Sequence, residues 1–204
     1  MPDADLSLAV PSVFFGAVGT AGQRCTSTRR LYLHNSIAPE FLERLQKLYK
    51  SVSPGDPLID GTLLGPLHSR TACHTYTNAI QHLRASGAEI LTGGNRYDQT
   101  PLNSGNFVEP TIAIPKSGGP NDAIWKTETF APILKVAIFD ELEQAIHWNN
   151  SVPQARTCLV LMANMTWYSW YWHNRDYRAV CGLGISEILE NGLVLVAQIL
   201  ALWT

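Results

Sequence analysis

The chain has 204 residues, of which 46% are hydrophobic, and its formal net charge is −2, a composition that suits one globular domain with an appendage. No block of Lys or Arg stands out, which argues against a nucleic-acid partner or an anionic membrane surface. Four cysteines without a short-range pairing pattern, and a first segment unlike a signal peptide, indicate a reducing compartment, with the cytoplasm expected.

Residues 1–154 alternate helical and strand patterns, with turn residues where the period changes. Pro11 should kink the first helix or set its effective start. Pro39 stands at the front of the second helix, and Gly87 closes the third. The alternation predicts an α/β layered domain. In chain order the predicted elements are a helix over 6–18, a strand over 31–33, helices over 41–49 and 73–83, strands over 89–91, 107–114 and 133–139, and a helix over 142–146.

The tail, residues 155–204, differs in character from the first part. Five aromatic residues crowd positions 167–172, and the apolar run 192–203 is too short to span a bilayer, which needs about 20 such residues. Extending the run backwards brings in Glu187 and Glu190, which are costly in lipid. We therefore expect a core helix or a divergent tail rather than a membrane anchor.

Two common kinds of site do not fit the sequence. The glycines of segment 16–22 have the wrong spacing for a dinucleotide-binding loop, and the segment follows a predicted helix rather than a strand. His68, His74 and His82 are not four residues apart, and there is no Cys-x-x-Cys pair, so no metal site is predicted.

Cys25 lies in the glycine-punctuated run Gly19–Thr26, with Arg24 directly before it and two arginines close behind. Small neighbours let a substrate approach the backbone, and nearby cations favour the thiolate, which is the nucleophilic form. Cys25 is thus either a nucleophile or one more small buried residue, as most free cysteines are. His34 could activate it in a hydrolase-type dyad, but lies at the far end of a predicted strand.

Glu128 and Phe130 are two residues apart at the entry to the predicted strand 133–139. If the backbone there is extended, the two side chains point to one face. Such a pair can bind sugar hydroxyls and a flat heterocycle. The alternative is a solvated carboxylate beside a core phenylalanine.

The run Gly22-Gln23-Arg24-Cys25 resembles the nucleophile loop of the aldehyde dehydrogenase superfamily. Glu128-Thr129-Phe130-Ala131-Pro132 resembles that superfamily's Glu-x-Phe-Gly-Pro motif, with Ala131 in place of glycine. The resemblance covers about residues 3–154 and is strongest to the antiquitin branch, the α-aminoadipic semialdehyde dehydrogenases. It implies that residues 1–154 form an incomplete catalytic domain, without the Rossmann NAD domain.

This resemblance implies a mechanism. Cys25 would attack an aldehyde, and hydride transfer to NAD and hydrolysis of a thioester would yield a carboxylic acid. The Cys25 backbone N–H would hold the oxyanion in part. Arg24 would bind the polar end of a semialdehyde and Thr26 would line the same pocket. Glu128 would bind the nicotinamide ribose and Phe130 would position the ring.

Family members carry the NAD domain, a second oxyanion donor and the general-base glutamate before this segment, and their closing strands after it. We therefore expect a truncated form with little or no dehydrogenase turnover of its own, in which the thiol retains esterase-like reactivity. The alternative is a non-catalytic isoform that associates with full-length subunits. Members of the branch occur in the cytosol and in mitochondria.

Overall fold

The computed structural model describes residues 1–97, 102, 105–116, 123–151, 159–160 and 181–182. Most of the tail predicted over 155–204 lies outside the described residues. Within it, β5 (Leu159–Val160) and β6 (Cys181–Gly182) form a parallel pair. The predicted domain boundary at residue 154 stays a prediction.

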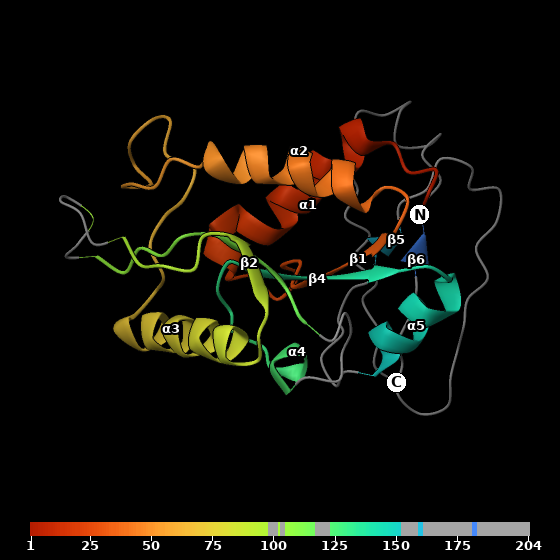
Figure 1. The fold of residues 1–204 in the computed structure, drawn as a ribbon. Helices are drawn as coiled ribbons and strands as arrows, with labels where there is room; N and C mark the ends of the chain where they lie inside the picture. The colour runs from red at the N-terminus through yellow and green to blue at the C-terminus, as the bar shows by residue number, and fades with distance from the viewer. Residues whose placement is uncertain (98–101, 103–104, 117–122, 152–158, 161–180, 183–204) are drawn as a thin grey trace, which may run out of the picture.

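A mixed four-stranded sheet forms the centre of the described fold (Figure 1). Its strand order is β1-β4-β3-β2, with β1 parallel to β4, β4 parallel to β3, and β2 antiparallel to β3. The strands comprise β1 (Arg30–His34), β2 (Glu89–Thr92), β3 (Thr111–Ile114) and β4 (Ile133–Phe139).

Helices cover both faces of this sheet. In Figure 1, α1 (Leu6–Val18) and α2 (Ala38–Lys50) lie on one face. The other face carries α3 (Arg70–Ala85), α4 (Ala123–Lys126) and α5 (Leu142–Asn150). Buried apolar side chains of the helices and strands join in one main core. The predicted α/β layered architecture is confirmed.

The helix ends follow the signals in the sequence. Asp5 caps α1 by accepting a hydrogen bond from the Ser7 backbone N–H at 2.8 Å, and Ser69 caps α3 in the same way through the Ala72 N–H at 3.1 Å. Gly87, with a φ of 79°, follows α3 and lets the Ala88 N–H reach back to the Leu83 carbonyl.

The predicted helix over 6–18 is confirmed as α1, which runs through Pro11, so only the alternative that Pro11 sets its start is wrong. Pro11 is exposed, so the carbonyl that loses its N–H partner can be hydrated. The strand predicted over 107–114 is shorter, because Pro110 has no N–H for the ladder: β3 begins at Thr111, and Val108 makes only an isolated bridge with Arg96.

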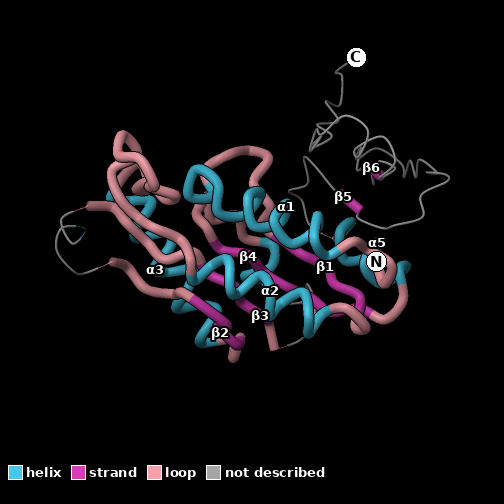
Figure 2. Tube along the Cα trace, turned by 90° about the horizontal axis from the view of Figure 1, so that it is seen from above, coloured by secondary structure: helices cyan, strands magenta, loops and turns pink. Residues whose placement is uncertain are grey.

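The parallel pairing of β1 and β4 determines where the candidate site forms. Arg30 is in register with Lys135, so the loop before β1 and the loop before β4 emerge at the same edge of the sheet. Figure 2 shows these neighbouring strands running together beneath α1 and α2. The two resemblance motifs occupy these two loops. About a hundred residues apart in sequence, they meet at the amino ends of adjacent strands.

Candidate active site

Cys25 lies in a tight turn formed by residues 24–27. The Ser27 backbone N–H donates to the Arg24 carbonyl at 3.1 Å, and the Arg24 N–H donates to the Ser27 Oγ at 3.1 Å. Cys25 and Thr26 occupy the two central positions, and the Cys25 thiol is exposed. The Cys25 N–H donates to no acceptor among the described residues. The turn therefore presents a thiol and an available backbone donor side by side.

The chain enters this turn through a left-handed segment that ends at Gly22. Thr20, Ala21 and Gly22 have φ values of 54°, 52° and 68°, a conformation that L side chains rarely adopt. A Cβ on Gly22 would lie 2.5 Å from the Ala131 carbonyl oxygen. Only glycine lets the turn that carries Cys25 pack this closely against the Ala131-Pro132 backbone.

Glu128 and Phe130 do not lie on an extended backbone. Phe130 has a φ of 49°, and β4 begins only at Ile133, so the geometry expected for this pair was wrong. The two side chains nonetheless converge on one partner, the guanidinium of Arg29. The left-handed residue turns the Phe130 ring back toward the nucleophile loop, where it is 40% exposed.

Arg29 contacts both motifs. Its Nε donates to Glu128 Oε1 at 3.0 Å, and its guanidinium carbon lies 4.2 Å from the centroid of the Phe130 ring. Its Nη1 donates to the Gly22 carbonyl at 3.1 Å and its Nη2 to the Arg24 carbonyl at 3.0 Å. Burial lowers the pKa of Arg29, while Glu128 and Cys25 oppose that shift.

Gln23 secures the other side of the turn. Its Oε1 accepts from the His68 backbone N–H at 2.9 Å and lies 2.9 Å from the His68 Nδ1, and its Nε2 donates to the Pro66 carbonyl at 3.3 Å. The segment 64–68 thus supports the loop that carries Cys25 through one amide side chain.

The Arg24 side chain folds back over the end of α1. Its Nη2 donates to the Phe15 carbonyl at 3.2 Å, and its guanidinium carbon lies 4.8 Å from the centroid of the exposed Phe15 ring. A Cβ on Gly19 would lie 2.5 Å from that Nη2, so the glycine makes room for it. The Arg24 Nε is buried and has no acceptor among the described residues.

Lys135 holds the segment that leads to Glu128. Lys135 lies in the inner strand β4, and its buried Nζ donates to the carbonyls of Ile124, Trp125 and Thr127 at 2.8, 3.2 and 2.9 Å. Burial, with smaller effects of Arg30 and Arg29, lowers the pKa of Lys135 to about 7. This ammonium caps the last turn of α4, where carbonyls lack partners within the helix.

The structure brings the sequence-predicted site residues together. Cys25, Arg24 and Thr26 share one turn, and Arg29 joins that turn to Glu128 and Phe130. The roles assigned to these residues stay predictions. His34 is not part of the cluster: it ends β1 and its Nδ1 lies 2.8 Å from the Ser36 Oγ.

Sequence reasoning missed the structural roles of Arg29, Gln23 and Lys135. Arg29 was noted only as a nearby cation, and Gln23 only as part of a motif. Lys135 carried one usable signal, since it is the charged residue in the otherwise apolar strand Ile133–Phe139. A charge in such a strand needs buried acceptors.

The residues present fit a nicotinamide riboside, the part of NAD expected here. Phe130 offers an exposed ring, and the Glu128 side chain is 33% exposed and uses one carboxylate oxygen on Arg29. Both lie beside the loop that carries Cys25. A flat ring and an accessible carboxylate next to a thiol suit a planar heterocycle that carries ribose hydroxyls.

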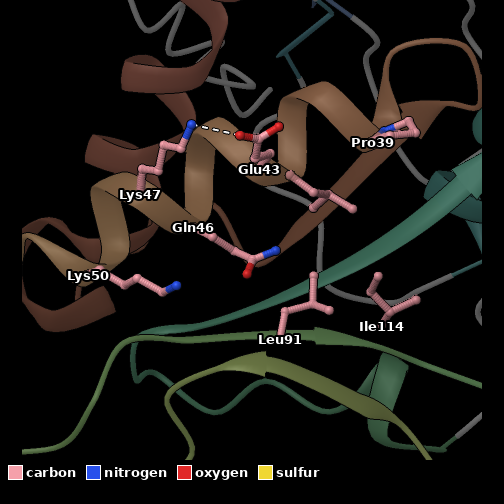
Figure 3. Close-up of a pocket in the computed structure, with 8 residues that line it drawn as sticks. Pro39, Glu43, Gln46, Lys47, Lys50, Leu91 and Ile114 are labelled. Atoms are coloured by element: carbon pink, nitrogen blue, oxygen red, sulfur yellow. Dashed lines mark hydrogen bonds and ion pairs between the residues drawn. The ribbon is translucent and has the colours of Figure 1, made fainter.

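Other parts of the described structure offer weaker sites. A groove of about 270 Å³ lies between α2 and the antiparallel strands β2 and β3 (Figure 3). Its charged rim residues Glu43 and Lys47 pair with each other at 2.7 Å, and no candidate site residue lines it.

No group of His, Cys, Asp or Glu that could hold a metal occurs in the described part of the chain. Among the same residues, no helix is long and apolar enough to cross a membrane.

Comparison with known proteins gives a consistent result. The family profile described as "Aldehyde dehydrogenase family" matches residues 1–171, which runs past the predicted boundary at residue 154. Aldehyde dehydrogenase family 7 member A1 of Pisum sativum is 51% identical over 154 residues, 76% of this chain and 29% of that protein. The α-aminoadipic semialdehyde dehydrogenase of Bos taurus is 44% identical over 164 residues, 80% of this chain and 29% of that protein.

Among solved structures, betaine aldehyde dehydrogenase of Staphylococcus aureus in complex with NAD+ superposes with a TM-score of 0.75 at 29% identity. The match covers 78% of this chain and 31% of that one. The chain thus spans about a third of the length of the relatives it matches, with shares of 29% to 31% in these three comparisons.

Proposed function

Because the chain belongs to the aldehyde dehydrogenase family, we propose that it carries the nucleophile-bearing part of an enzyme that oxidises an aldehyde to a carboxylic acid with NAD. The observation that carries this proposal is the contact between two motifs a hundred residues apart: the Cys25 turn and the Glu128–Phe130 segment share the guanidinium of Arg29. This contact supports a shared site for the proposed nucleophile and the proposed cofactor-binding groups.

In this mechanism the Cys25 thiolate attacks the aldehyde carbon and forms a thiohemiacetal. The oxyanion that develops can accept from the Cys25 N–H, which has no other acceptor in the described structure. NAD, when bound, would supply the acceptor for the hydride that the thiohemiacetal loses as it becomes a thioester. Glu128 and Phe130 would hold and orient the nicotinamide riboside, and water would then hydrolyse the thioester on Cys25 to the acid.

The substrate we propose is a semialdehyde whose far end carries a carboxylate. Arg24 lies directly before the proposed nucleophile, and its guanidinium donates to the Phe15 carbonyl through Nη2. Its other N–H groups would pair with a substrate carboxylate through charge-assisted hydrogen bonds. The similarity to the Bos taurus α-aminoadipic semialdehyde dehydrogenase supports this choice.

A second candidate function is a non-catalytic subunit piece that associates with longer homologous subunits. It is favoured by three apolar side chains exposed in the segment between α2 and α3: Leu58, Ile59 and Leu63 are 92%, 63% and 57% exposed. Such a cluster on a surface suits contact with another chain.

One experiment separates the two functions. The purified chain is incubated with a semialdehyde and NAD, NADH is followed by absorbance, and protection of Cys25 from iodoacetamide is followed by mass spectrometry. Sustained NADH formation that Cys25→Ala abolishes supports the enzyme. Protection of Cys25 without NADH, together with co-elution with a longer homologue, supports the subunit piece. Absence of both protection and NADH would contradict the role given to the thiol.

A further inference from the structure

All three nitrogens of the Arg29 guanidinium donate hydrogen bonds, and their acceptors lie in two different loops. Nε binds the Glu128 carboxylate at 3.0 Å, Nη1 and Nη2 bind the carbonyls of Gly22 and Arg24 at 3.1 and 3.0 Å, and the planar face stacks 4.2 Å from the Phe130 ring centroid. The Arg24 carbonyl also closes the turn that carries Cys25. A single side chain therefore contacts the backbone of the nucleophile turn and both candidate cofactor-binding residues.

The position of Arg29 is itself well fixed. Its side chain is 11% exposed, and its carbonyl accepts from the Lys135 N–H at 3.0 Å, immediately before β1 pairs with β4. Burial makes each charge-assisted bond stronger than it would be on a surface. A lysine could keep the charge but not the three directed donors and the flat face.

The neighbouring cations do not duplicate this arrangement. Within the described structure, the Lys135 ammonium donates to carbonyls in the segment 124–127, and the Arg24 guanidinium donates to the Phe15 carbonyl. Arg30 donates to the Trp125 carbonyl at 3.3 Å. Arg29 donates to both loops of the site.

We infer that Arg29 is a positioning residue that couples the two halves of the site, fixing the Cys25 turn relative to Glu128 and Phe130. The inference rests on the proposed function for its meaning, since those three residues are the thiol and the cofactor-binding groups. Loss of the guanidinium should loosen both loops together. Loss of the Glu128 carboxylate should loosen only the second loop, because Arg29 still binds the Gly22 and Arg24 carbonyls.

Hydrogen exchange of the 204-residue chain, without NAD or aldehyde, tests this coupling. The probes are the Ser27 amide, which closes the nucleophile turn, and the Ile133 amide, which bonds the Ala131 carbonyl at 2.7 Å. In Arg29→Gln and Arg29→Lys, both amides should exchange about 10- to 100-fold faster, as expected for a lost hydrogen bond to a charged group. In Glu128→Gln, only the Ile133 amide should do so.

The pH profile of Cys25 alkylation by iodoacetamide, followed by mass spectrometry of the Cys25 peptide, gives a second readout. Arg29→Gln removes a guanidinium whose charge interacts with Cys25 and should move the alkylation midpoint up. Glu128→Gln leaves the Arg29 charge unpaired and should move it down. General loosening of the fold would not move the alkylation midpoint in opposite directions in the two variants.

Arg84→Gln is the matched control, because Arg84 binds one distant carbonyl, that of Gly94, at 3.2 Å. It should change neither amide nor the alkylation midpoint. Faster exchange at only one loop in both Arg29 variants, equal shifts in Arg29→Gln and Glu128→Gln, or the same effects from Arg84→Gln would each overturn the inference. If Arg29→Gln fails to fold, Arg29→Lys and Glu128→Gln still decide it. None of these measurements requires turnover, so they stand apart from the NADH test.

Discussion

Gly22 lies against the backbone of Ala131, so close that a Cβ on the glycine would be 2.5 Å from the Ala131 carbonyl oxygen. The glycine belongs to the nucleophile loop and the alanine to the segment after Phe130. This close approach, together with the Arg29 contacts, makes the two motifs one structural unit.

The contact predicts that Gly22→Ala is strongly destabilising. Its φ of 68° already strains an L residue, and the neighbouring atoms belong to the backbone, which cannot rotate away. We expect the free energy of unfolding to fall by more than about 2 kcal/mol, measured by urea titration. The matched control is Gly61→Ala, with a φ of 85° and no atom within 4 Å of the added Cβ, which should cost only about 1 kcal/mol. Equal losses in both variants would contradict the steric argument.

Because the Cys25 thiol is exposed, we expect the chain to hydrolyse esters in a reaction that depends on Cys25. The purified chain should cleave p-nitrophenyl acetate, and Cys25→Ala should lower the rate by about tenfold or more, because acyl transfer to the thiolate is lost. Cys73 is the natural control, since it is buried in α3 and burial raises the pKa of its thiol. Cys73→Ala should keep the ester activity and lose about 1 kcal/mol of stability. Unchanged ester hydrolysis in Cys25→Ala would contradict the assignment of Cys25 as the nucleophile.

Because of Arg24, we expect the chain to prefer substrates that carry a terminal carboxylate. We expect the chain to cleave the p-nitrophenyl half-ester of adipic acid faster than a neutral ester of the same length. Arg24→Met should reduce that ratio by about 10-fold or more, the size of a lost charge-assisted hydrogen bond, and leave the neutral ester unaffected. Parallel losses for both esters would mean that Arg24 only supports the turn.

Because the pKa of Lys135 is lowered in the folded chain, we expect the free energy of unfolding to rise with pH above neutrality. Its folded pKa is lowered to about 7 from the ordinary 10.5, so between these values the unfolded chain binds more protons than the folded chain. The free energy of unfolding should therefore increase with pH across this interval, by up to about 1.4 kcal/mol per pH unit from this group. Urea titrations of the parent and Lys135→Met at several pH values should show this slope in the parent alone. Parallel curves for the two proteins would refute it.

Much of the local structure could be read from the sequence. Apolar spacing identified four of the five described α-helices but not α4, and Asp5, Ser69 and Gly87 act at the helix ends as their residue types favour. The order of two motifs was enough for the family. The helices and their caps could be predicted because they depend on neighbours within a few residues along the chain.

Only the tertiary structure decided how the site is assembled. The parallel register of β1 and β4 sets Arg30 beside Lys135, and from that pairing follow the partners of Arg29, the burial of Lys135 and the left-handed turn at Phe130. The partners of these side chains lie up to 99 residues away, so no local pattern specifies them. The sequence determined which residues we propose for the chemistry, whereas strand pairing decided that one largely buried guanidinium contacts both of the segments that carry them.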